Sequence, residues 1–276
     1  TIFCVSIIFP FWDVIIMSFT PSKCVNTLEI WLWPKKFSFD SYTYVLSNNK
    51  ILRAFFVSVF RTVFGTLVHL ALVICASYPL SKRELPYRKL VTMFFLIPMF
   101  FSGGLIPSYV INRYLGLTNN LLVYIIPGAF SMYVTIIVRN YFMSIDKGME
   151  ESALIEGATV TIILMKIVIP LSKPVLATIS LWHIVSQWNS WFDCMIYIQD
   201  EKKIVLQMIL RRMISNLDMW SEEMRNYALQ NPQVVNFTSK TVQAAITLIV
   251  IAPIMCVYPF LQKYFVKGIM LGAIKG

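Results

Sequence analysis

Charged residues are scarce in this sequence. They make up 14% of its 276 residues, whereas hydrophobic residues make up 57% and the mean hydropathy is +0.67. A soluble domain carries about 25% charged residues, because water must solvate its whole surface. The composition therefore excludes a soluble globular domain, a disordered chain and a fibrous repeat. It predicts an integral membrane protein with room for about six helices of roughly 20–25 residues.

The residues that build metal sites and disulfide frameworks are also few. Histidine occurs only twice, and the five cysteines show no paired spacing. Four of the five lie in apolar stretches, where cysteine usually serves as a small apolar packing residue. We therefore predict neither a metal site nor a disulfide framework. The cysteines are Cys4, Cys24, Cys75, Cys194 and Cys256.

Catalytic and nucleotide-binding patterns are missing as well. No phosphate loop of the form G-x-x-x-x-G-K-[ST] occurs, so we expect that the chain itself does not hydrolyse ATP. No Ser/His/Asp or paired-carboxylate arrangement stands outside the apolar segments, and no catalytic residue is predicted. The net charge of +10 is scattered among apolar runs rather than gathered on one face, which argues against nucleic-acid binding. Such an excess of Lys and Arg is ordinary in inner-membrane proteins.

Six apolar segments are close to or above the length that crosses a hydrocarbon core of ~30 Å. Thr1 already lies inside an apolar run, so we expect that the true N-terminus is missing. No small-residue cleavage site follows the first segment, which argues against a cleavable signal peptide. We treat residues 1–276 as one transmembrane domain. Its helices are predicted at about 1–20, 53–80, 90–112, 120–142, 174–198 and 241–262.

The third segment contains Pro98, Gly103, Gly104 and Pro107. These residues weaken or interrupt a helix, and a bilayer tolerates such a break only where protein or water satisfies the freed backbone groups. We predict a kinked or briefly broken helix. The alternative is a helix that ends near Phe101 and is followed by a re-entrant segment.

The loop over residues 144–173 is the most informative part of the sequence. It reads SIDKGMEESALIEGATVTIILMKIVIPLSK. Two short helical pieces are predicted on either side of Gly157, and Pro170 closes the second. Gly157 can adopt the positive φ of a tight turn, and it has no side chain to keep two helices from crossing closely.

The spacing in this loop resembles the EAA loop of ABC importer permeases. Glu151-Ser152-Ala153 is followed after three residues by Gly157 and after nine more by Ile167, and a single residue separates Ile167 from Ile169-Pro170. The family pattern is Glu-Ala-Ala, then Gly, then Ile-x-Leu-Pro, so Ser152 and Ile169 are conservative departures. The resemblance implies that this loop is the coupling helix, which sits in a cleft of a cytosolic ATPase. The residues that it assigns to this coupling are Glu151, Ala153, Gly157, Ile167 and Pro170.

The resemblance extends over essentially the whole chain. Pro10-Phe11 with Ser18-Phe19 is similar to the end of the first helix in maltose-type sugar permeases, and several later segments match the same group. The C-terminal segment resembles the subgroup that works with oligosaccharide-binding lipoproteins. The matching segments are Ala76–Ser81, Phe101–Pro107, Leu115–Asn119 and Tyr258–Gly268.

Membership of this family implies an all-α fold of the type I ABC importer (MetI-like) kind, with six transmembrane helices in a bacterial inner membrane. It places residues 81–89 and 144–173 in the cytosol. The implied partners are a second homologous permease, two ATP-binding subunits and an extracytoplasmic sugar-binding lipoprotein. ATP and Mg would bind to the ATP-binding subunits, so this chain holds no cofactor.

The implied activity is the import of oligosaccharides by alternating access. Closure of the ATPases would push on the coupling loops and rock the helices between inward-open and outward-open states. Two alternatives remain open at this point. One is an ABC permease for a non-sugar solute such as amino acids or phosphate; the other is a secondary transporter that works alone, although matched inverted halves are missing.

A polar stripe marks the fifth segment. At about 100° per residue, its polar residues fall within an arc of roughly 160°, joined by Trp182. Polar groups at this depth face a partner helix or water rather than lipid. The stripe predicts either a sugar path or hydrogen bonds to the second permease, while Trp188 and Trp191 fall outside it and are interpreted as packing residues. The stripe comprises His183, Ser186, Gln187, Asn189, Ser190 and Asp193, of which all but Ser190 are candidate path residues.

Arg61 places a charge within the second apolar segment, with Ser58, Gly65 and His69 on the same helical face. Arg53 is only eight residues away, so we expect the Arg61 side chain to snorkel toward the outer surface. The alternative is a role in the translocation cavity.

Overall fold

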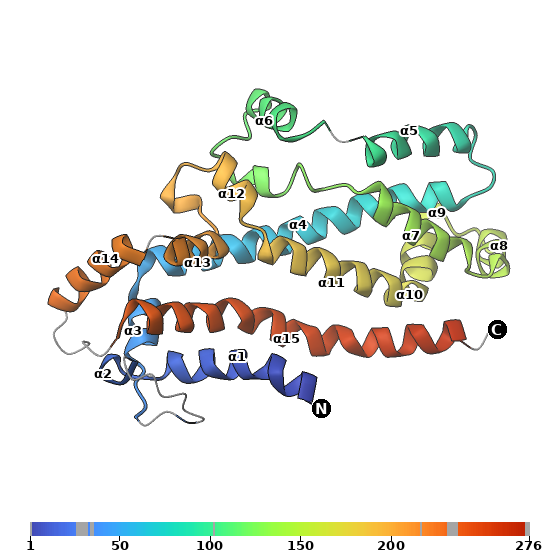
Figure 1. The fold of residues 1–276 in the computed structure, drawn as a ribbon. Coiled ribbons are helices and arrows are strands. Elements are labelled where there is room, and N and C mark those ends of the chain that lie inside the picture. Colours follow the sequence, from blue (N-terminus) through green and yellow to red (C-terminus); the bar gives the residue numbers. More distant parts are fainter. Residues whose placement is uncertain are drawn as a thin grey trace. The chain divides into compact units, whose positions relative to one another are not determined.

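The computed structural model of the protein describes residues 2–25, 33, 36–101, 103–215, 217–230 and 237–273. Over these residues the regular secondary structure is helical throughout, without a strand (Figure 1). The chain divides into two compact units. One unit comprises Thr1–Val59 and Ser190–Cys256, and the other comprises Phe60–Asn189 and Val257–Gly276.

The longest helices are α4 (Asn49–Ser81) and α15 (Ser239–Ala273). Within the described residues, α4 and the Ser239–Pro259 part of α15 are long and apolar enough to cross a membrane by themselves. Two bent pairs of helices raise this number to four if each pair forms one span. Helix α1 (Ile2–Ser18) is apolar but shorter. These three helices lie over the first, second and sixth predicted segments.

The unit of residues 1–59 and 190–256 packs around aromatic residues. Tyr44, on α3 (Asp40–Ser47), has its ring centre 4.9 Å from that of Tyr227 and 5.1 Å from that of Phe237. Ser41 donates a hydrogen bond to Thr241 on α15. Besides α1, α3 and the first parts of α4 and α15, this unit contains α2 (Ser22–Val25), α12 (Phe192–Tyr197), η3 (Glu201–Lys203), α13 (Leu206–Ser215) and α14 (Leu217–Gln230).

The central unit contains most of the functional candidates. Its helices are α5 (Arg88–Phe100), α6 (Leu105–Tyr114), η1 (Leu121–Tyr124), α7 (Met132–Met143), α8 (Lys147–Ile155), α9 (Val160–Ile163), η2 (Leu164–Val168, a π-helix), α10 (Ile169–Leu171) and α11 (Lys173–Asn189). The C-terminal half of α4 joins them.

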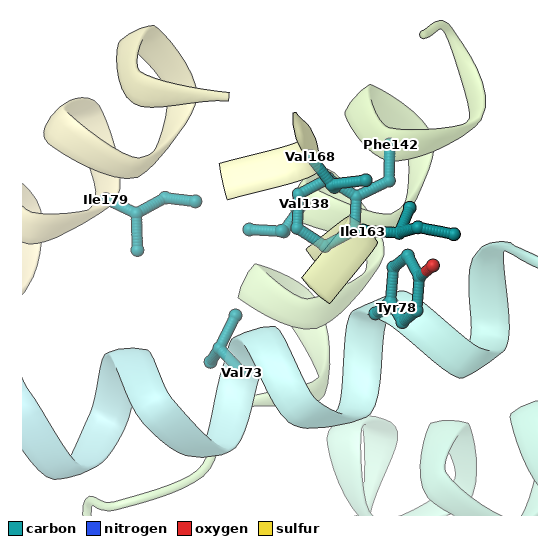
Figure 2. Packing of buried hydrophobic residues seen from close by; sticks show 7 residues of the cluster. All are labelled: Val73, Tyr78, Val138, Phe142, Ile163, Val168 and Ile179. Carbon is teal, nitrogen blue, oxygen red and sulfur yellow. The ribbon is translucent and has the colours of Figure 1, made fainter. Parts of the chain in front are cut away.

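A cluster of buried apolar side chains ties these helices together (Figure 2). Val73 and Tyr78 come from the end of α4, Val138 and Phe142 from α7, and Ile179 from α11. Burial of each such side chain contributes roughly 1.5–3 kcal/mol. Ile163 and Val168 add the second half of the loop over 144–173 to the cluster, so this loop is anchored to three longer helices.

The third predicted segment is interrupted. Helix α5 ends at Phe100, and α6 begins at Leu105 with its axis at 114° to that of α5. This bent pair is compatible with both predictions, a briefly broken span and a helix followed by a re-entrant segment. Gly104 has a φ of +82°, which lies outside the right-handed helical region, so one helix cannot run through this residue.

The fourth predicted segment is also interrupted. A continuous helix over 120–142 is wrong, because the one turn of η1 is followed by an irregular stretch and α7 begins only at Met132. Pro127 and Gly128 lie in that stretch and disfavour a helix interior. Ser131 then caps α7 by accepting a hydrogen bond from the backbone N–H of Val134.

The fifth predicted segment, 174–198, is divided where its polar stripe continues. Helix α11 ends at Asn189, and α12 starts at Phe192. Side chains of Asn, Ser and Asp compete with helical backbone hydrogen bonds. Here the Ser190 hydroxyl donates to Asp193 Oδ1 at 3.2 Å, and the same oxygen accepts the Cys194 N–H at 2.9 Å. The arc calculated for one straight helix therefore does not hold beyond Asn189.

Candidate functional site

The loop over 144–173 folds as α8, a tight turn, and a second helical stretch made of α9, η2 and α10. Pro170 lies inside α10 and does not close this stretch as predicted. Asp146 caps α8 by accepting the N–H of Gly148 at 3.0 Å, and Thr159 caps α9 by accepting the N–H of Ile162 at 3.4 Å. Between them Gly157 has a φ of +81°. The predicted pair of helical pieces is present, and each begins with its own cap.

Of the two reasons predicted for glycine at the turn, the structure supports the positive φ and contradicts the close crossing of helices. A Cβ atom built on Gly157 meets nothing within 4 Å, so close crossing of the two helices does not require glycine here. The positive φ does require it, because an L-residue in this region costs roughly 1–2 kcal/mol. The turn is therefore sensitive to any side chain, however small.

An ion pair joins this loop to the end of α4. Lys82 directly follows α4, and its ammonium group contacts the Glu150 carboxylate on α8. The same ammonium group lies 4.4 Å from the centre of the Tyr78 ring, a cation–π contact. Both charged side chains are partly buried, with 30% and 18% of their surfaces exposed. The short basic loop over 81–89 and the loop over 144–173 thus meet at one end of the unit, in agreement with their common cytosolic placement.

Charges of both signs surround this junction. The backbone amide of Glu84 itself, and then the charges of Lys147 and Lys82, hold the pKa of the Glu84 carboxyl below its ordinary value. A hollow of about 410 Å³ opens between the end of α4, the end of α7 and the two loop helices. The charged residues that line it are Lys82, Arg83, Glu84, Lys147, Glu150 and Glu151.

The five predicted coupling residues divide into two groups. Glu151, Gly157 and Pro170 are exposed. Ala153 and Ile167 are half-buried and pack against the cluster of Figure 2. The first group is available to a partner, whereas the second fastens the loop to the rest of the unit.

Sequence reasoning missed the exposed apolar residues of this loop. Ile155, next to the turn, is 88% exposed, and three neighbours are exposed as well. A polar loop that exposes several large apolar side chains commonly marks an interaction surface. The sequence did contain a sign of this exposure. Leu154 and Ile155 directly precede an acidic residue and the glycine of the turn, where apolar side chains have few neighbours to bury them. The four residues are Met149, Leu154, Ile155 and Val160.

Arg61 does not snorkel, and that prediction is wrong. Its side chain is 3% exposed. Its Nε donates a hydrogen bond of 2.7 Å to Gln187 Oε1, and its guanidinium carbon lies 4.8 Å from the centre of the Tyr124 ring. A buried charge needs such partners, because leaving it unsatisfied costs several kcal/mol. Arg61 therefore joins α4 to α11 inside the unit.

Two histidines continue this buried polar cluster. His69 and His183 stack with ring centres 4.1 Å apart, and His183 Nδ1 lies 3.1 Å from the Thr66 hydroxyl. Gly65 allows α4 and α11 to approach here, because a Cβ atom on it would lie 3.3 Å from Gln187 Nε2. The helical face predicted for Arg61 thus meets the polar stripe of α11.

The structure separates the candidate path residues. Gln187 is buried against Arg61, and His183 is half-buried against His69. Ser186 and Asn189 are exposed on α11, while Asp193 belongs to α12 in the other unit. Trp188 is buried, in line with a packing role. The predicted stripe is therefore no single surface.

Apolar helices of membrane-spanning length, together with a capped two-piece loop at one end, define an integral membrane component of a transport system. The chain belongs to the family of binding-protein-dependent transport system inner membrane components, which it matches over residues 70–271.

Curated relatives resemble the chain over nearly its full length. Protein LplC of Bacillus subtilis (strain 168) is 37% identical over 271 residues, which cover 98% of this chain and 90% of that protein. The polygalacturonan/rhamnogalacturonan transport system permease protein YtcP of the same organism is 36% identical, with 98% and 93% covered.

A solved structure is similar to this one. In the crystal structure of a bacterial ABC transporter involved in the import of the acidic polysaccharide alginate, one chain matches with a TM-score of 0.88 and 34% identity. The match covers 96% of this chain and 92% of that one. The chain is thus similar in sequence and fold to permeases of ABC importers.

Proposed function

We propose that the chain is a permease subunit of an ATP-driven, binding-protein-dependent importer of oligosaccharides. The observation that carries this proposal is the loop over 144–173, in which two capped helices flank the positive φ of Gly157. This loop lies in a chain that matches a transport family over residues 70–271. Such a loop can transmit a push only if it is held rigidly, and Ala153 and Ile167 hold it against the buried cluster.

The exposed side of the loop is the proposed contact with the ATPase. Glu151 supplies a charge there, and Leu154 and Ile155 supply apolar surface that is exposed in this chain. Burial of apolar side chains within a polar rim is typical of protein interfaces. Movement of a docked ATPase would pass through α8 to Lys82 and the end of α4.

The remaining partners follow from the same assignment. A second permease would complete the translocation path, and an extracytoplasmic sugar-binding lipoprotein would deliver the substrate. Two ATP-binding subunits would bind ATP and Mg²⁺ and supply the energy, because this sequence contains no phosphate loop. This chain would contribute membrane helices that change orientation between the inward-open and outward-open states of the importer.

The proposed count of six membrane spans goes beyond the two to four that length and hydropathy support among the described helices. We assign one span each to α1, α4 and α15. The bent pair α5–α6, the segment from η1 to α7, and α11 with the preceding α10 supply the other three. Broken helices of this kind are tolerated in a bilayer where protein or a water-filled cavity satisfies the backbone.

Carbohydrate is the favoured substrate class. YtcP is named for the transport of polygalacturonan and rhamnogalacturonan, and the similar solved structure is named for the import of alginate. On α11, Ser186 and Asn189 are the exposed polar residues that could line the sugar path, whereas Gln187 is held inside the unit. A non-sugar solute is the second candidate, and uptake measurements would distinguish the two.

A glycine pair in the coupling loop provides the test. We expect Gly157→Ala to reduce oligosaccharide uptake several-fold in proteoliposomes that contain the whole complex, because the methyl group meets no neighbour and acts only through φ. Gly148→Ala is the matched control in the same loop, since Gly148 has no positive φ and its added Cβ would lie 3.4 Å from Asp146 Oδ1. Normal uptake by Gly157→Ala at normal subunit abundance would show that this loop is not the coupling element.

A further inference from the structure

We propose that Arg211 binds a carboxylate group of an acidic oligosaccharide at the extracytoplasmic side of this permease. The proposal rests on the proposed function and narrows its substrate class to sugars that carry carboxylates. It concerns α13 and Trp191, which lies two residues beyond the end of α11, and not the loop over 144–173.

Arg211 is held flat on an aromatic ring. Its guanidinium carbon lies 3.4 Å from the centre of the Trp191 ring, and its side chain is exposed on α13. Stacking of this kind uses the face of the guanidinium plane and leaves its N–H edges available. Those edges form the planar fork that binds a carboxylate through two parallel hydrogen bonds. The stack therefore orients Arg211 before any ligand arrives.

The helix that carries Arg211 is firmly packed on its opposite face. Leu206, Ile209 and Met213 are each exposed by 2% or less. The backbone N–H of Leu206 donates a hydrogen bond of 2.8 Å to the hydroxyl of Ser58 on α4, within the same unit. A binding group on a rigid element loses less entropy when its ligand binds than one on a mobile loop.

The neighbouring charges distinguish Arg211 from Arg212. Arg212 forms an ion pair of 2.6 Å with Glu201, and Lys203 lies 3.6 Å from Asp200. Within the part of the chain that the structure describes, no carboxylate is paired with Arg211. The basic residues Lys203 and Arg212 are thus neutralised locally, and neither of these ion pairs involves Arg211.

Chain order places α13 on the extracytoplasmic side. The loop over 144–173 is cytosolic in the proposed topology, and α11 then crosses the membrane before α12 and α13 begin. An acidic sugar released by a binding protein would meet α13 before it reached the membrane interior. An uncharged sugar has no group that requires this arginine.

The test compares an acidic sugar with its neutral counterpart. Proteoliposomes that contain the whole complex and its binding protein are supplied with labelled trigalacturonate or with the same trisaccharide after chemical reduction of its carboxyl groups. We expect Arg211→Gln to reduce trigalacturonate uptake about tenfold at low salt, the size of one charge-assisted hydrogen-bonding contact. We expect the same variant to take up the neutral trisaccharide as well as the wild type does. Arg211→Lys keeps the charge without the fork and gives an intermediate value, whereas the control Arg212→Gln transports both sugars as the wild type does.

A second measurement identifies the source of the carboxylate. Docking of the sugar-free binding protein to the complex is measured for the wild type and Arg211→Gln, and equal affinities support the proposal. Weaker docking to the variant would assign the carboxylate to the binding protein and overturn the sugar site, as would an equal loss of both sugars or no loss at all. A wild type that imports only the neutral trisaccharide overturns this inference and leaves the proposed function intact. A wild type that imports no oligosaccharide with any binding protein removes the proposed function itself.

Discussion

Arg61 shows at the residue scale how this chain accommodates a charge within an apolar helix. The guanidinium group is buried, and Gln187 accepts its Nε–H at 2.7 Å while Tyr124 lies under its guanidinium carbon. Hydrogen bonds to charged groups contribute about 1.5–3 kcal/mol, and a polar group that loses its partner inside a protein is costly. Gln187 therefore stabilises a buried charge inside the protein. A side chain that lines a water-filled sugar path would not need to do so.

Replacement of Gln187 tests this assignment. We expect Gln187→Ala to lower the yield and the melting temperature of the purified complex, because the Nε–H of Arg61 loses its acceptor. Ser186→Ala is the adjacent control, since Ser186 is exposed and its loss removes no buried partner. Both quantities are measured by size-exclusion chromatography and a thermal-shift assay in detergent. A Gln187→Ala complex that assembles and melts normally but transports poorly would instead make Gln187 a residue of the sugar path.

At the scale of elements, the contact between Lys82 and Glu150 connects the proposed coupling loop, residues 144–173, to the end of α4. The two residues are 68 positions apart, and Lys82 also rests on the Tyr78 ring. Helix α4 runs from this contact back to Arg61, so one long helix carries both the junction with the loop and the buried polar cluster. A displacement of α8 would therefore act directly on the helix that packs against α11.

Charge reversal tests this connection. We expect Lys82→Glu and Glu150→Lys each to reduce uptake several-fold, because two like charges then meet in a partly buried site. The double variant, which restores one charge of each sign, should recover most of the activity. Arg83→Glu makes the same change of charge on an exposed neighbour and serves as the control. If the double variant is no better than the single ones in the proteoliposome assay, the ion pair does not hold the loop.

At the scale of the whole molecule, the chain provides apolar helices, but its sequence contains no phosphate loop that could bind a nucleotide. Its family is that of an inner-membrane component within a larger transport system. The exposed apolar residues of the loop over 144–173 form the surface that we propose for contact with a partner.

The dependence on partners gives the last prediction. The purified chain alone should show no ATP turnover above the blank in a phosphate-release assay, because it lacks an ATPase site. The assembled complex should hydrolyse ATP, and more so with the sugar-loaded binding protein. A complex whose ATP-binding subunits carry a disabled phosphate loop is the control for contaminating enzymes. ATP turnover by the purified chain alone would contradict the division of labour proposed above.

Local features of this protein were predictable from its sequence. Apolar composition is a property of each segment by itself, which is why the runs over 53–80 and 241–262 already indicated the helices α4 and α15. The turn at Gly157 depends on the φ of one residue, and the spacing around it was sufficient to indicate the two short helices and the family.

Tertiary structure decided what depends on distant neighbours. Arg61 and Gln187 lie 126 positions apart, so nothing near Arg61 in the sequence showed that a hydrogen-bond acceptor would keep its side chain inside the unit. The polar stripe seemed continuous because a helical projection assumes one straight helix, whereas the hydrogen bond between Ser190 and Asp193 accompanies the end of α11. Periodicity describes a regular segment, but the burial of a charge and the end of a helix depend on which groups the fold brings together.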